Sequence, residues 1–109
     1  MLDAANTLVT ITSGVDEKAY LANRTLQLAA ERCIEIIGEA ARYVSRSFRD
    51  AHPEIQWTKI VAQRHILAHH YGAIQHERLW RVVETHVPAL VAQLTPLVPV
   101  VPENPADGT

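Results

Sequence analysis

Apolar residues recur every three or four positions over most of the first 94 residues, and no segment alternates convincingly between apolar and polar residues. A spacing of three to four is the repeat of one helix face, whereas a half-buried strand alternates with period two. We therefore expect an all-α chain. The pattern predicts helices over residues 2–12, 23–48, 57–70 and 79–94, with a short turn or helix around 15–22.

The longest predicted helix begins after Asn23, a residue type that commonly caps a helix N-terminus. Its apolar stripe consists of Leu26, Ala29 or Ala30, Cys33, Ile36 or Ile37, Ala40, Val44 and Phe48. Gly38 interrupts this stripe, and a glycine inside a helix costs about 1 kcal/mol relative to alanine. We expect a second helix to pack closely against the chain at this glycine.

Two residues predict where the last two helices break. Gly72 follows the helix over 57–70 and suits a left-handed C-cap. Pro88 lies inside the last predicted helix and should kink or divide it near Glu84, because proline lacks an N–H and clashes with the preceding turn.

Prolines at positions 96, 99, 102 and 105 dominate the C-terminal end of the chain. Such spacing opposes both helix and sheet and favours extended polyproline geometry. We interpret residues 1–94 as one helical domain and residues 95–109 as a disordered Pro-rich tail. The alternative is that apolar tail residues lie along a partner's groove, namely Leu97, Val98, Val100 and Val101.

The net charge is −2 at pH 7, but the charge is unevenly distributed. Between Lys59 and Arg81 lie four basic residues and one acid, together with four of the six histidines. The remainder carries six basic and eleven acidic residues. A polyanion would therefore bind within this window, where Lys59, Arg78 and Arg81 are the candidate contacts outside the histidines.

Cys33 is the only cysteine, which excludes an intrachain disulfide and fits a reducing compartment. Its apolar neighbours predict a buried, inert thiol. The N-terminus lacks the basic start of a signal peptide, and no apolar run approaches the roughly 20 residues needed to cross a bilayer. We expect a cytoplasmic protein with no membrane partner.

The stretch RHILAHHYG, from Arg64 to Gly72, gathers an arginine, three histidines and a tyrosine. Arg64 falls on the apolar seam of its helix, and a guanidinium costs several kcal/mol to bury without a partner. It would pair with Glu35 or Glu39 in a structural salt bridge, or face a wet cleft or a second copy of the chain. Arg64 and His69 lie about 140° apart around an ideal helix, so they converge only near a helix end or across a groove.

A metal site among these histidines is the alternative. His65 and His69 are four residues apart and share a helix face that can hold a metal ion. No cysteine and no HExxH pattern accompanies them, and only Glu77 is an acid close in sequence. We therefore expect no metal and no cofactor. His65, His70 and His76 are better explained as solvated or RNA-facing side chains.

Arg64, His69 and Tyr71 match the R-x4-H-x-Y signature of HepT-type HEPN-domain toxins, which belong to HEPN/MNT toxin–antitoxin pairs of bacteria and archaea. The surrounding sequence resembles this family in three blocks, in order and spacing: CIEIIGEAARYVS (33–45), HPEIQWTKIVAQRHILAHHYG (52–72) and LWRVVETHVPALVAQL (79–94). Together the blocks cover about half of the chain. One departure is His65, at a position where the family commonly has asparagine.

The resemblance implies a HEPN-like, up-and-down bundle of four to five helices. It also implies a homodimer in which two copies of the motif line a cleft between protomers. The implied activity is metal-independent cleavage of RNA (tRNA or mRNA), with Arg64 and His69 as the catalytic pair. The implied antitoxin is an MNT-type nucleotidyltransferase that transfers AMP to Tyr71, and ATP is needed only as the AMP donor of that partner enzyme.

The residue types suit this reaction on chemical grounds. A 2′-hydroxyl can attack the adjacent phosphate when a base removes its proton, and histidine titrates near neutral pH. The planar fork of arginine suits a phosphate that gains charge in the transition state. The alternative is a non-catalytic HEPN helical module that only docks a nucleotidyltransferase or another protein. Arg64 would then be a structural salt bridge, and His69 a capping or core histidine.

Overall fold

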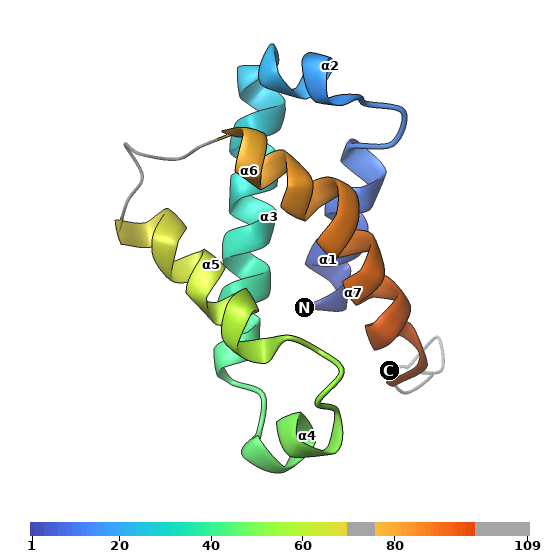
Figure 1. Cartoon of the computed structure of the whole chain (residues 1–109), viewed down its shortest axis with the longest axis vertical. Helices are drawn as coiled ribbons and strands as arrows, with labels where there is room; N and C mark the ends of the chain where they lie inside the picture. Colours follow the sequence, from blue (N-terminus) through green and yellow to red (C-terminus); the bar gives the residue numbers. More distant parts are fainter. Residues whose placement is uncertain (70–75, 98–109) are drawn as a thin grey trace, which may run out of the picture.

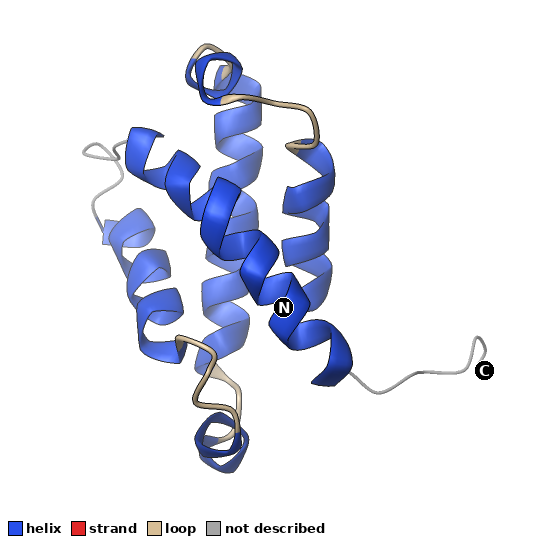
Figure 2. Ribbon diagram, turned by 45° about the vertical axis from the view of Figure 1, so that its right-hand side comes forward, coloured by secondary structure: helices blue, strands red, loops and turns tan. Residues whose placement is uncertain are grey.

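The computed structural model describes residues 1–69 and 76–97, and every regular element within these ranges is helical (Figure 2). The helices are α1 (Leu2–Ile11), α2 (Glu17–Leu21), α3 (Arg24–Arg42), α4 (Arg46–Ala51), α5 (Trp57–His69), α6 (His76–Arg81) and α7 (Val87–Leu94). A π-helical segment, Val82–His86, joins α6 to α7, and a short 3₁₀ turn, Thr95–Leu97, follows α7. The all-α prediction is confirmed. The predicted cap at Gly72 and residues 98–109 of the predicted tail lie outside the described residues.

The long helix α3 is the centre of the bundle (Figure 1). α1 and α5 both pack against α3, α7 packs against α1, and α2 contacts α3 and α6. Apolar side chains from these helices form one core, and its largest fully buried members are Leu8, Tyr20, Ile55 and Leu79. None of the helices within the two described ranges has the length and apolar character required to span a membrane.

Side-chain caps mark where α3 and α4 begin. The Oδ1 atom of Asn23 accepts a hydrogen bond of 3.0 Å from a backbone N–H in the first turn, which confirms the predicted N-cap. The helix ends at Arg42, however, and the hydroxyl of Ser45 accepts the backbone N–H of Phe48 at 3.2 Å to begin α4. The prediction of one helix over 23–48 was wrong because serine satisfies backbone donors outside a helix and so starts a new one.

Pro88 interrupts the regular α-helix between α6 and α7, as predicted. Proline offers no N–H to the carbonyl four residues earlier, that of Glu84, and its ring clashes with that carbonyl in a regular α-helix. The chain widens into the π-helical segment around Glu84, and Pro88 lies at the start of α7, where a missing N–H costs least.

α5 crosses α3 at Gly38. A Cβ atom added to Gly38 would overlap the Cβ of Arg64 and would lie 2.9 Å from the Arg64 Cγ and 3.1 Å from the carbonyl oxygen of Ile60. Ordinary van der Waals contacts are longer than this, so only a residue without a side chain permits the crossing. The predicted close packing at Gly38 is confirmed, and Arg64 is the residue that fills the space.

Gly38→Ala should destabilise the protein, although alanine is the better helix former by about 1 kcal/mol. The added methyl group must push α5 away from α3, and overpacking of this kind costs about 1–3 kcal/mol. Urea unfolding measures the change in the free energy of unfolding.

Ala29→Gly is the matched control, because Ala29 is exposed on the same helix. This variant should lose about 1 kcal/mol through helix propensity alone. A Gly38→Ala variant more stable than the parent protein would contradict the close approach of the two helices.

Candidate active site

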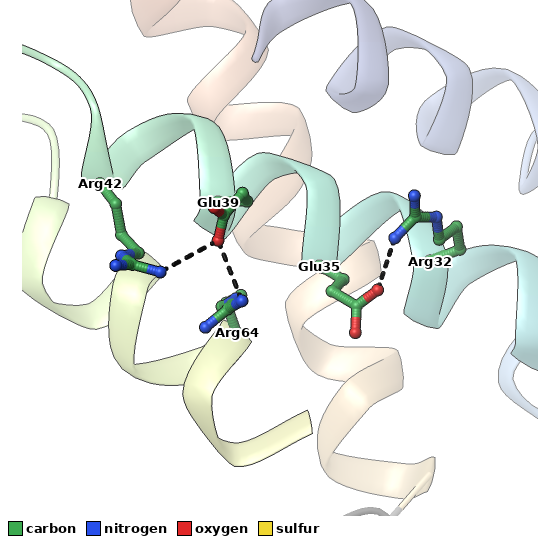
Figure 3. A network of polar contacts seen from close by, with 5 residues as sticks. All are labelled: Arg32, Glu35, Glu39, Arg42 and Arg64. Atoms are coloured by element: carbon green, nitrogen blue, oxygen red, sulfur yellow. Dashed lines mark hydrogen bonds and ion pairs between the residues drawn. The ribbon is translucent and has the colours of Figure 1, made fainter. Parts of the chain in front are cut away.

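Arg64 is the motif residue whose side chain the structure describes. It extends from α5 next to Gly38, and its Nη2 atom lies 3.0 Å from Oε1 of Glu39 on α3 (Figure 3). Of the two acids expected as partners, Glu39 is the one that pairs, whereas Glu35 binds Arg32 at 2.7 Å. The Arg64 side chain is 26% exposed and that of Glu39 is 40% exposed, so this ion pair lies at the surface.

One carboxylate oxygen serves two guanidinium groups. The Oε1 atom of Glu39 is also 3.2 Å from Nη1 of Arg42, on the same helix (Figure 3). Two positive charges thus share one negative charge, and the three residues carry a net positive charge. The Nε atom of Arg64 is buried and has no hydrogen-bond partner among the described residues. Because Glu39 is shared with Arg42, the positive charge of Arg64 is only partly neutralised.

Arg64 borders a shallow groove of about 320 Å³ along α3. The lining combines charged and apolar side chains, namely Arg32, Glu35, Ile36, Glu39, Ala40, Tyr43 and Arg64. Ile36 and Tyr43 are exposed, and Leu28, two helical turns before Ile36, is exposed as well. Of the doublet Ile36/Ile37 only Ile37 is buried. The salt bridge and the open cleft, which the sequence left as alternatives for Arg64, are both present.

The roles of the remaining residues of RHILAHHYG are still predictions from the sequence. His65 and His69 belong to α5, in which Arg64 is the last residue with a described side chain. His70 and Tyr71 lie outside the described residues. The backbone is helical through His69, and the convergence of Arg64 and His69 on one group remains an expectation from the sequence.

The three basic residues predicted to contact RNA lie apart from the groove at Arg64. Lys59 is exposed on α5 and lines a second, mainly apolar groove of about 390 Å³ between α5 and α7, together with His86. Arg78 and Arg81 are exposed on α6 and border neither groove. Lys59, Arg78 and Arg81 therefore do not join Arg64 in one lining.

A second polar cluster, absent from the predictions above, lies inside the bundle. Glu31 on α3 is only 6% exposed, and its Oε2 atom lies 3.8 Å from Nδ1 of His76, the first residue of α6. His76, predicted to be solvated or RNA-facing, has a side chain that is 27% exposed and an Nδ1 atom that is fully covered, so this nitrogen points into the protein. The available signal was the pair Gln27 and Glu31, two polar residues four apart on the buried stripe of α3.

Tyr20 on α2 completes this cluster. Its ring is fully buried and lies against Trp80, with 5.0 Å between the ring centroids. Burial, and after it the negative charge of Glu31, raises the pKa of Tyr20 from 10.0 to about 12. Its hydroxyl has no hydrogen-bond partner among the described residues.

Within the described side chains, no three histidine, cysteine or carboxylate groups lie together as the ligands of a metal ion would. Cys33 is free and buried, and burial raises the pKa of its thiol. The predicted burial of this thiol is confirmed, and a raised pKa keeps the nucleophilic thiolate scarce.

Comparison with known proteins places the chain in one group. A family described as "Ribonuclease HepT-like" matches residues 1–97. A protein of Methanocaldococcus jannaschii named as a candidate RNase is 36% identical over 90 residues, which are 83% of this chain and 83% of that protein.

Two further relatives carry similar names. A candidate ribonuclease HepT of Thermococcus cleftensis is 35% identical over 71 residues, or 65% of this chain and 64% of that protein. A candidate RNase of Caldanaerobacter subterraneus is 27% identical over 94 residues, or 86% and 84% of the two chains. No solved structure matches the chain.

The raised pKa of Tyr20 predicts a late step in an alkaline titration. The folded protein keeps the phenol protonated up to about pH 12, whereas the unfolded chain releases that proton near pH 10. The free energy of unfolding should therefore fall as the pH rises from about 10 to about 12, by roughly 3 kcal/mol. The ultraviolet absorption of tyrosinate measures the step directly.

Tyr20→Phe should remove the late step, whereas Tyr43→Phe, at an exposed ring, should leave it in place. A late step that persists in Tyr20→Phe would show that another tyrosine produces it.

Proposed function

The chain belongs to the HepT-like ribonuclease family, and on this basis we propose that it is the cytoplasmic, RNA-cleaving toxin of a HEPN/MNT toxin–antitoxin pair. The observation that carries the proposal is Arg64, a surface cation in a groove, which shares its single carboxylate partner with a second arginine. A purely structural arginine would be expected to have a carboxylate of its own.

In the proposed reaction, His69 takes the proton of a ribose 2′-hydroxyl as that oxygen attacks the adjacent phosphorus. The new 2′-O–P bond forms as the P–O5′ bond breaks, and the departing 5′-oxygen takes up a proton. The products are a 2′,3′-cyclic phosphate and a 5′-hydroxyl end. Arg64 donates hydrogen bonds to the phosphate oxygens, whose negative charge grows in the transition state. No metal ion takes part.

The ion pair with Glu39 is compatible with this role. Ion pairs between side chains as exposed as these contribute about 0–1 kcal/mol, so an incoming phosphate can compete for the guanidinium. If Arg64 left Glu39 to bind a phosphate, the carboxylate of Glu39 would still be paired with Arg42. Glu39 thereby orients Arg64 in the free protein without withdrawing its charge.

We expect a second copy of the chain to cover the apolar side chains around the groove. Leu28 and Ile36 are large apolar residues exposed on α3, the helix that carries Glu39, and Tyr43 is exposed at the C-cap of that helix. Exposed apolar groups grouped in this way are typical of protein–protein contacts. A homodimer through this face would bring two copies of Arg64 to one cleft.

Regulation by the antitoxin would act on Tyr71, two residues after His69. An MNT-type nucleotidyltransferase would transfer AMP from ATP to the phenolic oxygen. The adduct adds bulk and negative charge close to the position of the RNA phosphate, and like charges in one site repel. Modification would therefore neutralise the toxin without unfolding it.

One observation favours the alternative of a non-catalytic docking module. Arg64 is already paired with Glu39 in the free chain, as it would be in a structural salt bridge between α3 and α5. Under this alternative the apolar groove between α5 and α7 would receive the nucleotidyltransferase, and RNA would remain intact.

The purified protein should cleave RNA in the presence of a chelator, and Arg64→Ala and His69→Ala should each reduce kcat by about 100-fold or more. Gel analysis of a labelled total RNA pool measures the cleavage. Arg46→Ala is the control, because Arg46 is exposed on α4 and does not line the groove. Cleavage that persists in both motif variants, or that disappears with the chelator, would contradict the mechanism.

Incubation with the cognate nucleotidyltransferase and ATP should add the mass of AMP to the protein and abolish its cleavage of RNA. Intact mass spectrometry detects the adduct, and Tyr71→Phe should prevent it while Tyr43→Phe does not. Absence of an adduct together with absence of cleavage in the unmodified protein would favour the docking module.

A further inference from the structure

Glu31 is a charged residue at a position where charge is costly. Its side chain is 8% exposed, and neither carboxylate oxygen has a hydrogen-bond partner among the described residues. An ionised carboxylate in an apolar interior must be paired with a cation or a donor, or it destabilises the fold. The groups around Glu31 should therefore show which interaction offsets the cost of its charge.

Side chains from three helices face this carboxylate. Tyr20 comes from α2, and its hydroxyl is buried without a partner. Gln27, one turn earlier on α3, donates its amide to the backbone carbonyls of Tyr20 and Leu21 and is thus occupied. His76 comes from α6 and has its Nδ1 atom 3.8 Å from Glu31 Oε2. It is the one described residue that forms an ion pair with Glu31, provided that the imidazole is protonated.

His76 occupies a distinctive place in the chain. It is the first residue of α6 and stands five residues after Tyr71, so α6 is the first described element that follows the motif. Arg64 marks the point where the chain enters the motif. Both residues contact acids on α3, Arg64 at Glu39 and His76 at Glu31. These acids are eight residues apart, about 12 Å along a helix axis.

We propose that Glu31 is a positioning residue for RNA cleavage: by holding Nδ1–H of His76 inside the bundle, it fixes the start of α6 and so the C-terminal boundary of the motif. This inference rests on the proposed ribonuclease function. Glu31 itself touches no substrate, because it is buried between α2, α3 and α6. Two carboxylates of one helix thus constrain the two ends of the reactive segment.

The first test is the protonation state of the His76 imidazole. The contact with Glu31 at 3.8 Å is favourable only when Nδ1 carries a proton, because an unprotonated nitrogen would turn its lone pair toward a carboxylate, so Nδ1 should be protonated in the parent protein. Nitrogen-15 NMR of the histidine side chains reads this directly, and the His76 signal is assigned by its loss in His76→Phe. Glu31→Met should shift the proton to Nε2, whereas Glu77→Met, at an exposed acid beside His76, should not. An unprotonated Nδ1 in the parent protein would overturn the inference.

The second test separates positioning from stability. Replacing a buried charge by an apolar side chain of similar volume is often neutral or stabilising, so Glu31→Met should remain folded. Its kcat for RNA should nevertheless fall about 10- to 100-fold, the effect of a small displacement of reacting groups. KM should change by less than about twofold, because substrate binding is untouched. Glu77→Met should keep the parent kcat.

The pair also predicts a double-mutant result. His76→Phe keeps the volume of the ring, removes the donor and should lower kcat to the same extent as Glu31→Met. The double variant should be no slower than the slower single variant, since both changes remove one contact. An unchanged kcat in Glu31→Met and in His76→Phe would overturn the inference. If Glu31→Met does not fold, the kcat of His76→Phe alone is the test. If the parent protein cleaves no RNA, the proposed function fails, while the NMR measurement still decides whether Glu31 holds His76.

Discussion

The contact between Gly38 and Arg64 is the constraint on which the rest of the structure depends. Because position 38 has no side chain, α5 approaches α3 until the Cβ of Arg64 fills the space that a larger residue would occupy. The guanidinium then emerges beside Glu39 and at the edge of a groove. The packing of two backbones, rather than a loop, places this cation at the surface, and such placement holds a functional group with little freedom.

Local effects explain which parts of the fold could be predicted. The helices α1, α3 and α7 each bury one stripe, so the periodicity of apolar residues was sufficient to find them. Asn23 acts through a cap and Pro88 through a missing N–H, and both effects depend on a few adjacent residues. Ser45 was missed because Val44 and Phe48 continue the apolar spacing across it. Apolar periodicity alone cannot distinguish one long helix from two helices that bury the same side.

The candidate site was harder to predict, because it depends on contacts between helices that are distant in the sequence. Arg64 could be recognised as an anomaly on an apolar seam, but the choice of Glu39 over Glu35 follows from the height at which α5 crosses α3. The burial of Glu31 likewise requires α6, which lies 45 residues further along the chain. The sequence pattern of a single helix cannot predict either of these contacts between helices. The outcome is a central helix whose acids contact the first residue of the motif, Arg64, and a histidine that follows the motif, His76.

The structure of the protein bound to a strand that it cleaves, with a 2′-O-methyl group at the cleavage site, tests the central claim most directly. The methyl group blocks attack by the 2′-oxygen and leaves the phosphate in place. The account predicts that this phosphate lies in the groove along α3, within hydrogen-bond distance of the Arg64 guanidinium. A strand bound elsewhere, with Arg64 still paired to Glu39 alone, would contradict it.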